Sequence, residues 1–159
     1  MVRGKTAALF SAAAEVGGVI AGAPEEQVRA LHAYGDALGI AFQIVDDLLD
    51  YGGTTAVIGK NVGDDFRERK LTLPVIKAVA AASAEERAFW VRVIEKGQQG
   101  TGDLEQAMAL LARHGALDAT RNEALAWATK AKAALLTLPN HELRGMLSDL
   151  ADYVVARLN

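Results

Sequence analysis

Residues 43–50, QIVDDLLD, place three carboxylates in strongly apolar surroundings. On an α-helix, at about 100° per residue, the polar side chains of this segment fall within an arc of roughly 100°: Gln43, Asp46, Asp47 and Asp50. Apolar residues fill nearly all the rest of the circumference. A helix that is apolar nearly all round is normally buried, and Asp is almost never buried without a partner. The segment therefore predicts carboxylates that line an internal cavity.

The spacing of these acids predicts a metal ion. Asp46 and Asp50 are i,i+4 neighbours and Asp47 is adjacent, so their charges repel one another unless a cation lies between them. Oxygen ligands suit Mg²⁺, which takes one or two carboxylates, keeps some waters and completes its shell with substrate phosphates. The plainer interpretation is a solvated acidic edge, for which the apolar neighbours leave little room. We therefore predict that Asp46, Asp47 and Asp50 bind Mg²⁺.

Candidate cations stand on either side of the acidic segment. Lys5 and Thr6 begin an Ala-rich stretch, and a helix N-terminus with a Lys and a hydroxyl can bind an anion. From these two residues alone, a capping Thr6 and a solvated Lys5 are favoured. Residues 51–65 contain four glycines and Lys60, which is typical of a functional loop. Residues 63–70, GDDFRERK, add two aspartates and the cations Arg67, Arg69 and Lys70. A solvated charged turn is a good interpretation for Glu68 and Arg69.

The elements that must position these residues are all helical. Apolar periodicity, caps and breaks predict seven helices, over residues 5–20, 25–49, 71–82, 84–96, 102–114, 117–136 and 141–158. The first should be buried, and His32 on the second should be a packing residue. Gly35 and Gly39 predict a close helix contact, and Ser83 with Glu86 resembles a capping box. No segment alternates like a strand, so the predicted class is all-α.

Length and composition exclude several kinds of function. The 159 residues suffice for a single domain, 1–159, with a sizeable core. A formal net charge of -3 gives no basic surface for nucleic acid. The absence of Cys excludes disulfides and thiolate chemistry. Since no stretch approaches transmembrane length, we expect a cytoplasmic protein.

Four segments together resemble one enzyme family. They are GKTA at 4–7, FQIVDDLLD at 42–50, GK at 59–60 and GDDFRERKLTLP at 63–74. A single DDxxD motif is weak evidence, whereas four segments in this order are specific. The chain resembles the trans-isoprenyl diphosphate synthases, or polyprenyl synthetases, and most closely the bacterial octaprenyl and decaprenyl diphosphate synthases. The resemblance covers the whole chain and is specific over residues 4–74.

The resemblance implies a fold and an activity. The family is an all-helical bundle of the isoprenoid synthase type with a central cavity. Its members condense isopentenyl diphosphate with an allylic diphosphate in a Mg²⁺-dependent prenyl transfer, here to a long-chain polyprenyl diphosphate. Breaking the allylic C–O bond leaves pyrophosphate and an allyl cation, so cations must take up the leaving charge while neutral oxygens stabilise the allyl cation.

The resemblance also implies residue roles. The metal positions are Asp46, Asp47 and Asp50, of which Asp46 is the most direct. The positions that contact the diphosphate or its metal-bound waters are Lys5, Lys60 and Lys70. Thr6 and Gln43 match positions whose oxygens face the allylic carbon.

The largest departure from the family is length. Members are about twice as long, and their first aspartate-rich motif lies in the half that has no counterpart here. We therefore expect a C-terminal half that is truncated or completed by another chain, and that is inactive alone. Its uncovered apolar faces predict a homo-oligomer or a complex with a chain that carries the first half. The alternatives are a noncatalytic helical partner subunit of a prenyl synthase and, less well supported, a terpene cyclase fragment.

Overall fold

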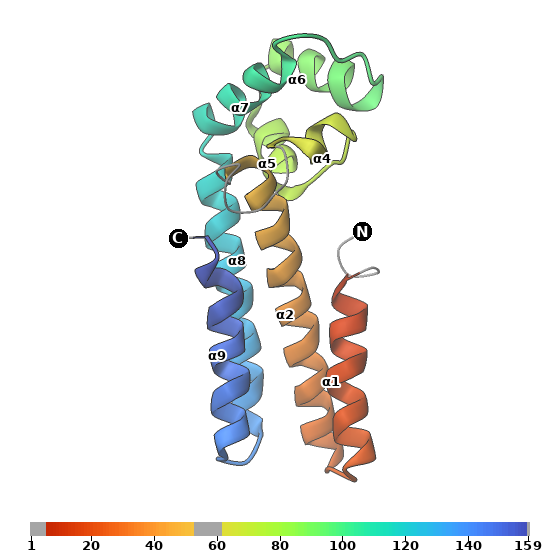
Figure 1. Cartoon of the computed structure of the whole chain (residues 1–159), viewed down its shortest axis with the longest axis vertical. Coiled ribbons are helices and arrows are strands. Elements are labelled where there is room, and N and C mark those ends of the chain that lie inside the picture. The colour runs from red at the N-terminus through yellow and green to blue at the C-terminus, as the bar shows by residue number, and fades with distance from the viewer. Residues whose placement is uncertain (1–5, 53–61, 159) are drawn as a thin grey trace. The chain divides into compact units, whose positions relative to one another are not determined.

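A computed structural model of the chain describes residues 6–52 and 62–158, and within these ranges it contains helices and no strands (Figure 1). The all-α prediction is therefore confirmed. The helices are α1 (Ala8–Ile20), α2 (Glu25–Gly52), α4 (Asp64–Arg67), α5 (Leu73–Ala81), α6 (Ala84–Trp90), η2 (Val91–Glu95), α7 (Asp103–Arg113), α8 (Ala116–Ala134), η3 (Leu135–Thr137) and α9 (Glu142–Ala156). None of the helices in the described ranges is long and apolar enough to cross a lipid bilayer.

All seven predicted helices are present, with ends that differ by a few residues. One helix, α4 with four residues, was not predicted because it lacks a full apolar period. The predicted helix at 84–96 consists of α6 and the π-helix η2, and its hydrogen-bond register changes at Val91.

The chain forms two compact units, residues 1–45 with 122–159 and residues 46–121. Whether 1–159 is a single domain stays a prediction. In the first unit, α1 packs against α2 through glycines: a Cβ at Gly35 would lie 2.6 Å from Cα of Ser11, and one at Gly39 would lie 2.6 Å from Cα of Ala7. The predicted close contact is confirmed. Tyr34 connects α2 to α9 by donating its hydroxyl to the carbonyl of Leu147 at 2.8 Å.

Two predictions about burial in this unit are wrong. The helix at 5–20 is predicted to be buried, but all the large apolar side chains of α1 except Phe10 are exposed, from 51% for Val16 to 81% for Ile20. The reason is that α1 meets α2 through Phe10 and small residues, which leaves the other large ones on its remaining faces. His32 is also exposed, and its Nδ1 lies 2.8 Å from Oε2 of Glu15. The expected uncovered apolar faces are confirmed, since α9 exposes a similar set: Leu143, Met146, Leu150 and Tyr153.

The second unit has its own core, in which Tyr51 from the end of α2 packs with residues of α4 to α8. The largest aromatic contributions are Phe66, Phe89 and Trp90. The capping box of Ser83 and Glu86 at the start of α6 is confirmed. Glu86 also accepts bonds from Arg113 at 2.9 Å and pairs with His114 at 3.0 Å, which ties α6 to the end of α7. The Ser83 backbone N–H, with these partners, lowers the pKa of Glu86 to about 2.

Candidate active site

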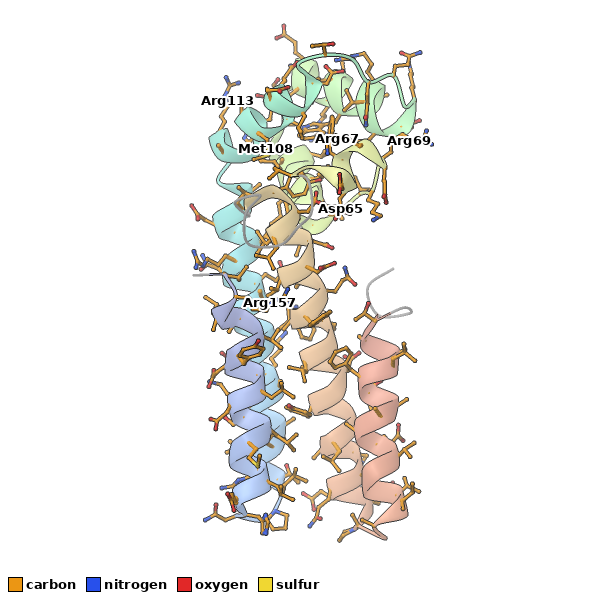
Figure 2. All side chains as sticks on the ribbon, viewed as in Figure 1. Asp65, Arg67, Arg69, Met108, Arg113 and Arg157 are labelled. Atoms are coloured by element: carbon orange, nitrogen blue, oxygen red, sulfur yellow. The ribbon has the colours of Figure 1, made fainter. Side chains whose placement is uncertain are left out.

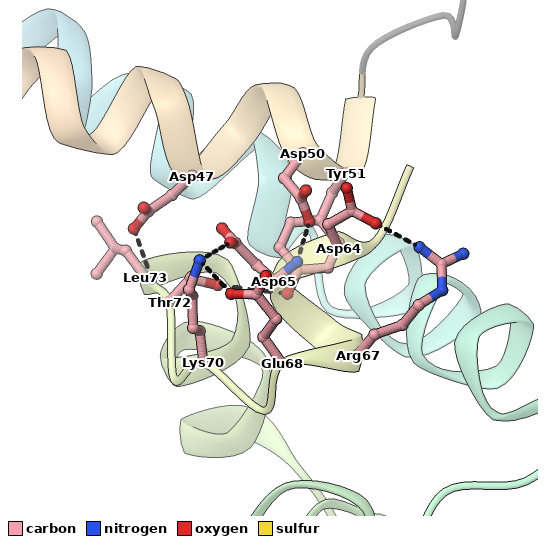
Figure 3. A network of polar contacts seen from close by, with 10 residues as sticks. All are labelled: Asp47, Asp50, Tyr51, Asp64, Asp65, Arg67, Glu68, Lys70, Thr72 and Leu73. Atoms are coloured by element: carbon pink, nitrogen blue, oxygen red, sulfur yellow. Dashed lines mark hydrogen bonds and ion pairs between the residues drawn. The ribbon is translucent and has the colours of Figure 1, made fainter. Parts of the chain in front are cut away.

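The three predicted metal ligands, Asp46, Asp47 and Asp50, lie on the last turns of α2. Figure 3 shows two of them, Asp47 and Asp50. Asp47 is buried, while Asp46 and Asp50 are half-buried. Burial raises the pKa of Asp50; the N–H of Asp65 opposes this shift, and the negative charges of Asp65 and Asp64 add to it. The end of α2 is therefore an acidic environment in which a cation would be stabilised.

Asp50 attaches the short helix α4 to the end of α2. Its Oδ2 accepts the backbone N–H of Asp65 at 3.1 Å, and its backbone carbonyl accepts the N–H of Gly63 at 2.9 Å. Gly63 can begin α4 because its φ of 83° is open to glycine. A side chain there would also collide with Leu104, whose Cδ1 lies 2.5 Å from the Cβ position.

Asp47 and Tyr51 hold the segment that precedes α5. The carboxylate of Asp47 accepts the backbone N–H of Leu73 at 3.4 Å, and Thr72 donates its hydroxyl to that of Tyr51, also at 3.4 Å. Both bonds are long and therefore weak. Burial is the main cause that raises the pKa of Tyr51 to about 12, so it stays protonated at neutral pH. The two bonds place Thr72 and Leu73 beside the acidic end of α2.

Lys70 is the predicted diphosphate-binding cation that the structure describes. Its Nζ lies 2.7 Å from Oε2 of Glu68 and 2.9 Å from Oδ1 of Asp65, and its backbone N–H bonds to the Asp65 carbonyl at 2.8 Å. The hydrogen bonds to Glu68 and Asp65 raise the pKa of Lys70. About half of its side chain remains exposed to solvent.

Acids outnumber cations in this network, which is drawn in Figure 3. Figure 2 shows Asp65 and Arg67 on α4 and Arg69 just after it, and Arg67 pairs with Asp64 at 2.9 Å. Among the residues that the structure describes, no three acids or histidines lie close enough to hold a metal ion by themselves. The donors are nevertheless all hard oxygens. They fit a Mg²⁺ ion whose shell is shared with phosphate oxygens.

Thr6 and Gln43, predicted from the resemblance to face one reacting carbon, lie together in the first unit. The Thr6 hydroxyl donates to Oε1 of Gln43 at 2.7 Å. Next to this pair, the rings of Phe10 and Phe42 lie 5.5 Å apart and fix α1 against α2. The guanidinium of Arg157 lies over the Phe42 ring at 5.7 Å, a contact that the sequence alone did not reveal.

Two predicted site residues, Lys5 and Lys60, lie outside the described ranges. The structure also adds residues that sequence reasoning missed as parts of one network: Asp64, Asp65 and Glu68. Their acidity was visible in GDDFRERK. The sequence did not reveal that these acids pair with Lys70 and Asp50, because the pairing depends on a turn with no helical period.

Known proteins resemble this chain over almost its whole length. The family model for polyprenyl synthetase matches residues 1–111. The crystal structure of a decaprenyl diphosphate synthase from Rhodobacter capsulatus is 72% identical with a TM-score of 0.93, covering 99% of this chain and 49% of that one. The octaprenyl diphosphate synthase of Haemophilus influenzae is 40% identical over 157 residues, which is 99% of this chain and 47% of that protein.

A third relative was solved with ligands. The polyprenyl synthase from Caulobacter crescentus, complexed with calcium and isoprenyl diphosphate, is 48% identical with a TM-score of 0.89, covering 98% of this chain and 47% of that one. This chain thus spans about half the length of the relatives that it matches. The family match over residues 1–111 and the shared helical fold agree with the motifs of the sequence, and the chain belongs to the polyprenyl synthetase family.

Proposed function

We propose that this chain supplies one wall of the active site of a Mg²⁺-dependent prenyltransferase. The reaction joins isopentenyl diphosphate to an allylic diphosphate and yields a long-chain polyprenyl diphosphate. The observation that carries the proposal is the attachment of Asp65 to Asp50, because it brings the Lys70 ammonium group into the same network as the acids of α2. The relatives include a decaprenyl and an octaprenyl diphosphate synthase, which supports the long-chain assignment. We infer a cytoplasmic location.

The proposed metal ligands are Asp46, Asp47 and Asp50, with Asp46 the most direct. Bound Mg²⁺ would neutralise the charge of the diphosphate leaving group. The oxygen-only donor set and the negative charges of Asp64 and Asp65 beside Asp50 support this assignment. A relative was solved in complex with calcium and isoprenyl diphosphate, which supports binding of a divalent cation and of a diphosphate.

The remaining roles concern charge in the transition state. Lys5, Lys60 and Lys70 would bind the diphosphate, where a fixed ammonium group stabilises the leaving anion. Thr6 and Gln43 would direct neutral oxygens at the allyl cation. The hydrogen bond between them supports this role, because it uses the hydroxyl proton of Thr6 and so directs the lone pairs of its oxygen elsewhere. A neutral oxygen stabilises the cation without the permanent charge that would trap it.

The chain should be inactive alone and should associate. It spans about half the length of its relatives, and α1 and α9 expose large apolar side chains. Exposed apolar surface of this extent favours association. We propose a homo-oligomer or a complex with a chain that carries the other half of the fold. Sedimentation velocity at micromolar concentration should show a species larger than a monomer, and a stable monomer would contradict this part of the proposal.

A second candidate function has its own supporting observation. Asp50 and Asp47 both accept backbone N–H groups, which is a structural use of the DDxxD acids. The chain could therefore be a noncatalytic helical partner subunit of a prenyl synthase that keeps the motif for folding. Under this alternative the half-buried Asp46 carries no catalytic role.

Substitution of Asp46 decides between the two functions. The chain would be combined with the half of the Rhodobacter capsulatus synthase that it does not match. The assay would measure prenyl transfer from an allylic diphosphate to isopentenyl diphosphate. Asp46→Ala should abolish activity if the chain is half of the enzyme, and should leave it unchanged if the chain is a noncatalytic partner. Glu105→Ala on α7, which removes an exposed acid remote in sequence from the motif, is the matched control.

A further inference from the structure

Gln99, between η2 and α7, bridges two backbone carbonyls with its side-chain amide. Its Nε2 donates to the carbonyl of Phe66 at 2.8 Å and to that of Val93 at 3.0 Å. Phe66 belongs to α4 and Val93 to the π-helix η2. Both N–H donors of the amide are therefore used to join α4 to η2.

The segment that carries Gln99 is itself held on both sides. The Arg92 guanidinium forms two bonds with the Asp103 carboxylate, at 2.7 and 2.9 Å, and donates to the Gln98 carbonyl at 2.8 Å. Asp103 also accepts the N–H of Gly100 at 2.7 Å. A paired Arg and carboxylate in this bidentate geometry is among the stronger polar contacts in proteins. Gln99 is thus presented from a fixed backbone.

The orientation of α4 depends on contacts outside it. A helix of four residues cannot be stable alone, since helix nucleation is unfavourable. The buried ring of Phe66 anchors α4 in the core. Hydrogen bonds attach α4 on two sides: Asp50 accepts the N–H groups of Asp65 and Gly63, and Gln99 donates to the Phe66 carbonyl.

We infer that Gln99 is a positioning residue for the candidate diphosphate site. By holding the Phe66 carbonyl it sets the direction of Asp65, which holds Lys70 through both its carboxylate and its backbone carbonyl. This inference rests on the proposed function, since it assigns Gln99 to the same site. Gln99 acts through the Phe66 and Val93 carbonyls that its amide holds, and we assign it no contact of its own with metal or diphosphate.

The test compares Gln99→Met, which removes the donors at similar length and adds no charge, with Gln98→Met at the exposed neighbouring position. Gln99→Lys restores N–H donors. Amide exchange of Asp65 and Lys70 in the full chain should speed up by about tenfold in Gln99→Met, because two hydrogen bonds are lost, and should be unchanged in Gln98→Met. Equal exchange in these two variants would overturn the inference.

A second measurement is the affinity for pyrophosphate in Mg²⁺ of the chain combined with its complementing half. A purely structural role of Gln99 would leave this affinity unchanged. Gln99→Met should weaken binding by about tenfold in a chain whose thermal melt shows that it is still folded, Gln99→Lys should restore binding, and Gln98→Lys should not change it. A Gln99→Lys variant as weak as Gln99→Met would contradict a donor role. Absence of binding in the unsubstituted protein would refute the proposed function instead, while exchange at Asp65 would still decide the role of Gln99.

Discussion

The hydroxyl of Thr6 donates a 2.7 Å hydrogen bond to Gln43, and so joins two residues that lie 37 positions apart in the sequence. The bond has the length of a good O–H···O interaction. It connects the residue just before α1 with the one that begins the acidic segment of α2. The two oxygens that the family resemblance assigns to one reacting carbon are therefore neighbours.

Thr6→Val should destabilise the chain by about 1 kcal/mol, since it removes this bond and keeps the side-chain shape. Thr6→Ser, which keeps the hydroxyl, should retain most of the stability. Urea denaturation of the three proteins measures the difference. If Val and Ser at position 6 gave the same midpoint, the hydrogen bond would contribute nothing measurable.

Gly35→Ala and Gly39→Ala should each destabilise the chain by about 1–3 kcal/mol. The added methyl group would meet backbone atoms of α1 at 2.6 Å, where no side-chain rearrangement can relieve the contact. Gly17→Ala is the matched control, because a Cβ at this helical position has no neighbour within 4 Å. It should be neutral or stabilising by up to about 1 kcal/mol, as Ala favours a helix over Gly. A loss of stability in Gly17→Ala as large as in Gly39→Ala would contradict the packing described for α1.

Lys70→Ala should weaken Mg²⁺-dependent pyrophosphate binding by about tenfold or more, because it removes a charge-assisted contact to the anion. The free energy of unfolding of the Lys70→Ala variant should change little, since ion pairs of a half-exposed Lys contribute little to folding. Lys96→Ala, at an exposed position after η2, controls for the loss of positive charge. Calorimetric titration with pyrophosphate and thermal melts separate the two effects. Equal affinities for the two variants would exclude Lys70 from the site.

Stability should fall in acid partly through Glu86. Its pKa in the folded chain is about 2, lowered from 4.5, so the unfolded chain binds the proton more tightly. The contribution of Glu86 is therefore fully present above about pH 4.5 and is lost as the pH falls toward 2. Melting temperatures between pH 6 and pH 2.5 should drop less steeply in Glu86→Gln than in the unsubstituted chain. Glu85→Gln, at the exposed neighbouring position, should keep the steep slope, and equal slopes for the two variants would contradict the assignment.

The helices and the acidic end of α2 could be predicted because both follow from periodicity and composition. Apolar spacing set the helix limits to within a few residues, Gly35 and Gly39 predicted a close contact, and Ser83 with Glu86 predicted a capping box. The partners of Lys70 were out of reach, because they depend on a turn in which Arg69 has a φ of 58°. The exposure of α1 could not be predicted from its apolar pattern either. Hydrophobicity predicts that a helix face is buried, but it does not identify the element that buries it.

The central claim is that Asp46, Asp47 and Asp50 form part of a site for Mg²⁺ and a diphosphate that the other half of the fold completes. The most direct measurement is calorimetric titration of pyrophosphate, once in Mg²⁺ and once in EDTA. The sample is the chain combined with the half of the Rhodobacter capsulatus synthase that it does not match. We predict binding in Mg²⁺ that disappears in EDTA and is strongly weakened by Asp46→Ala. Absence of metal-dependent binding in the combined halves, or full binding after Asp46→Ala, would contradict the account.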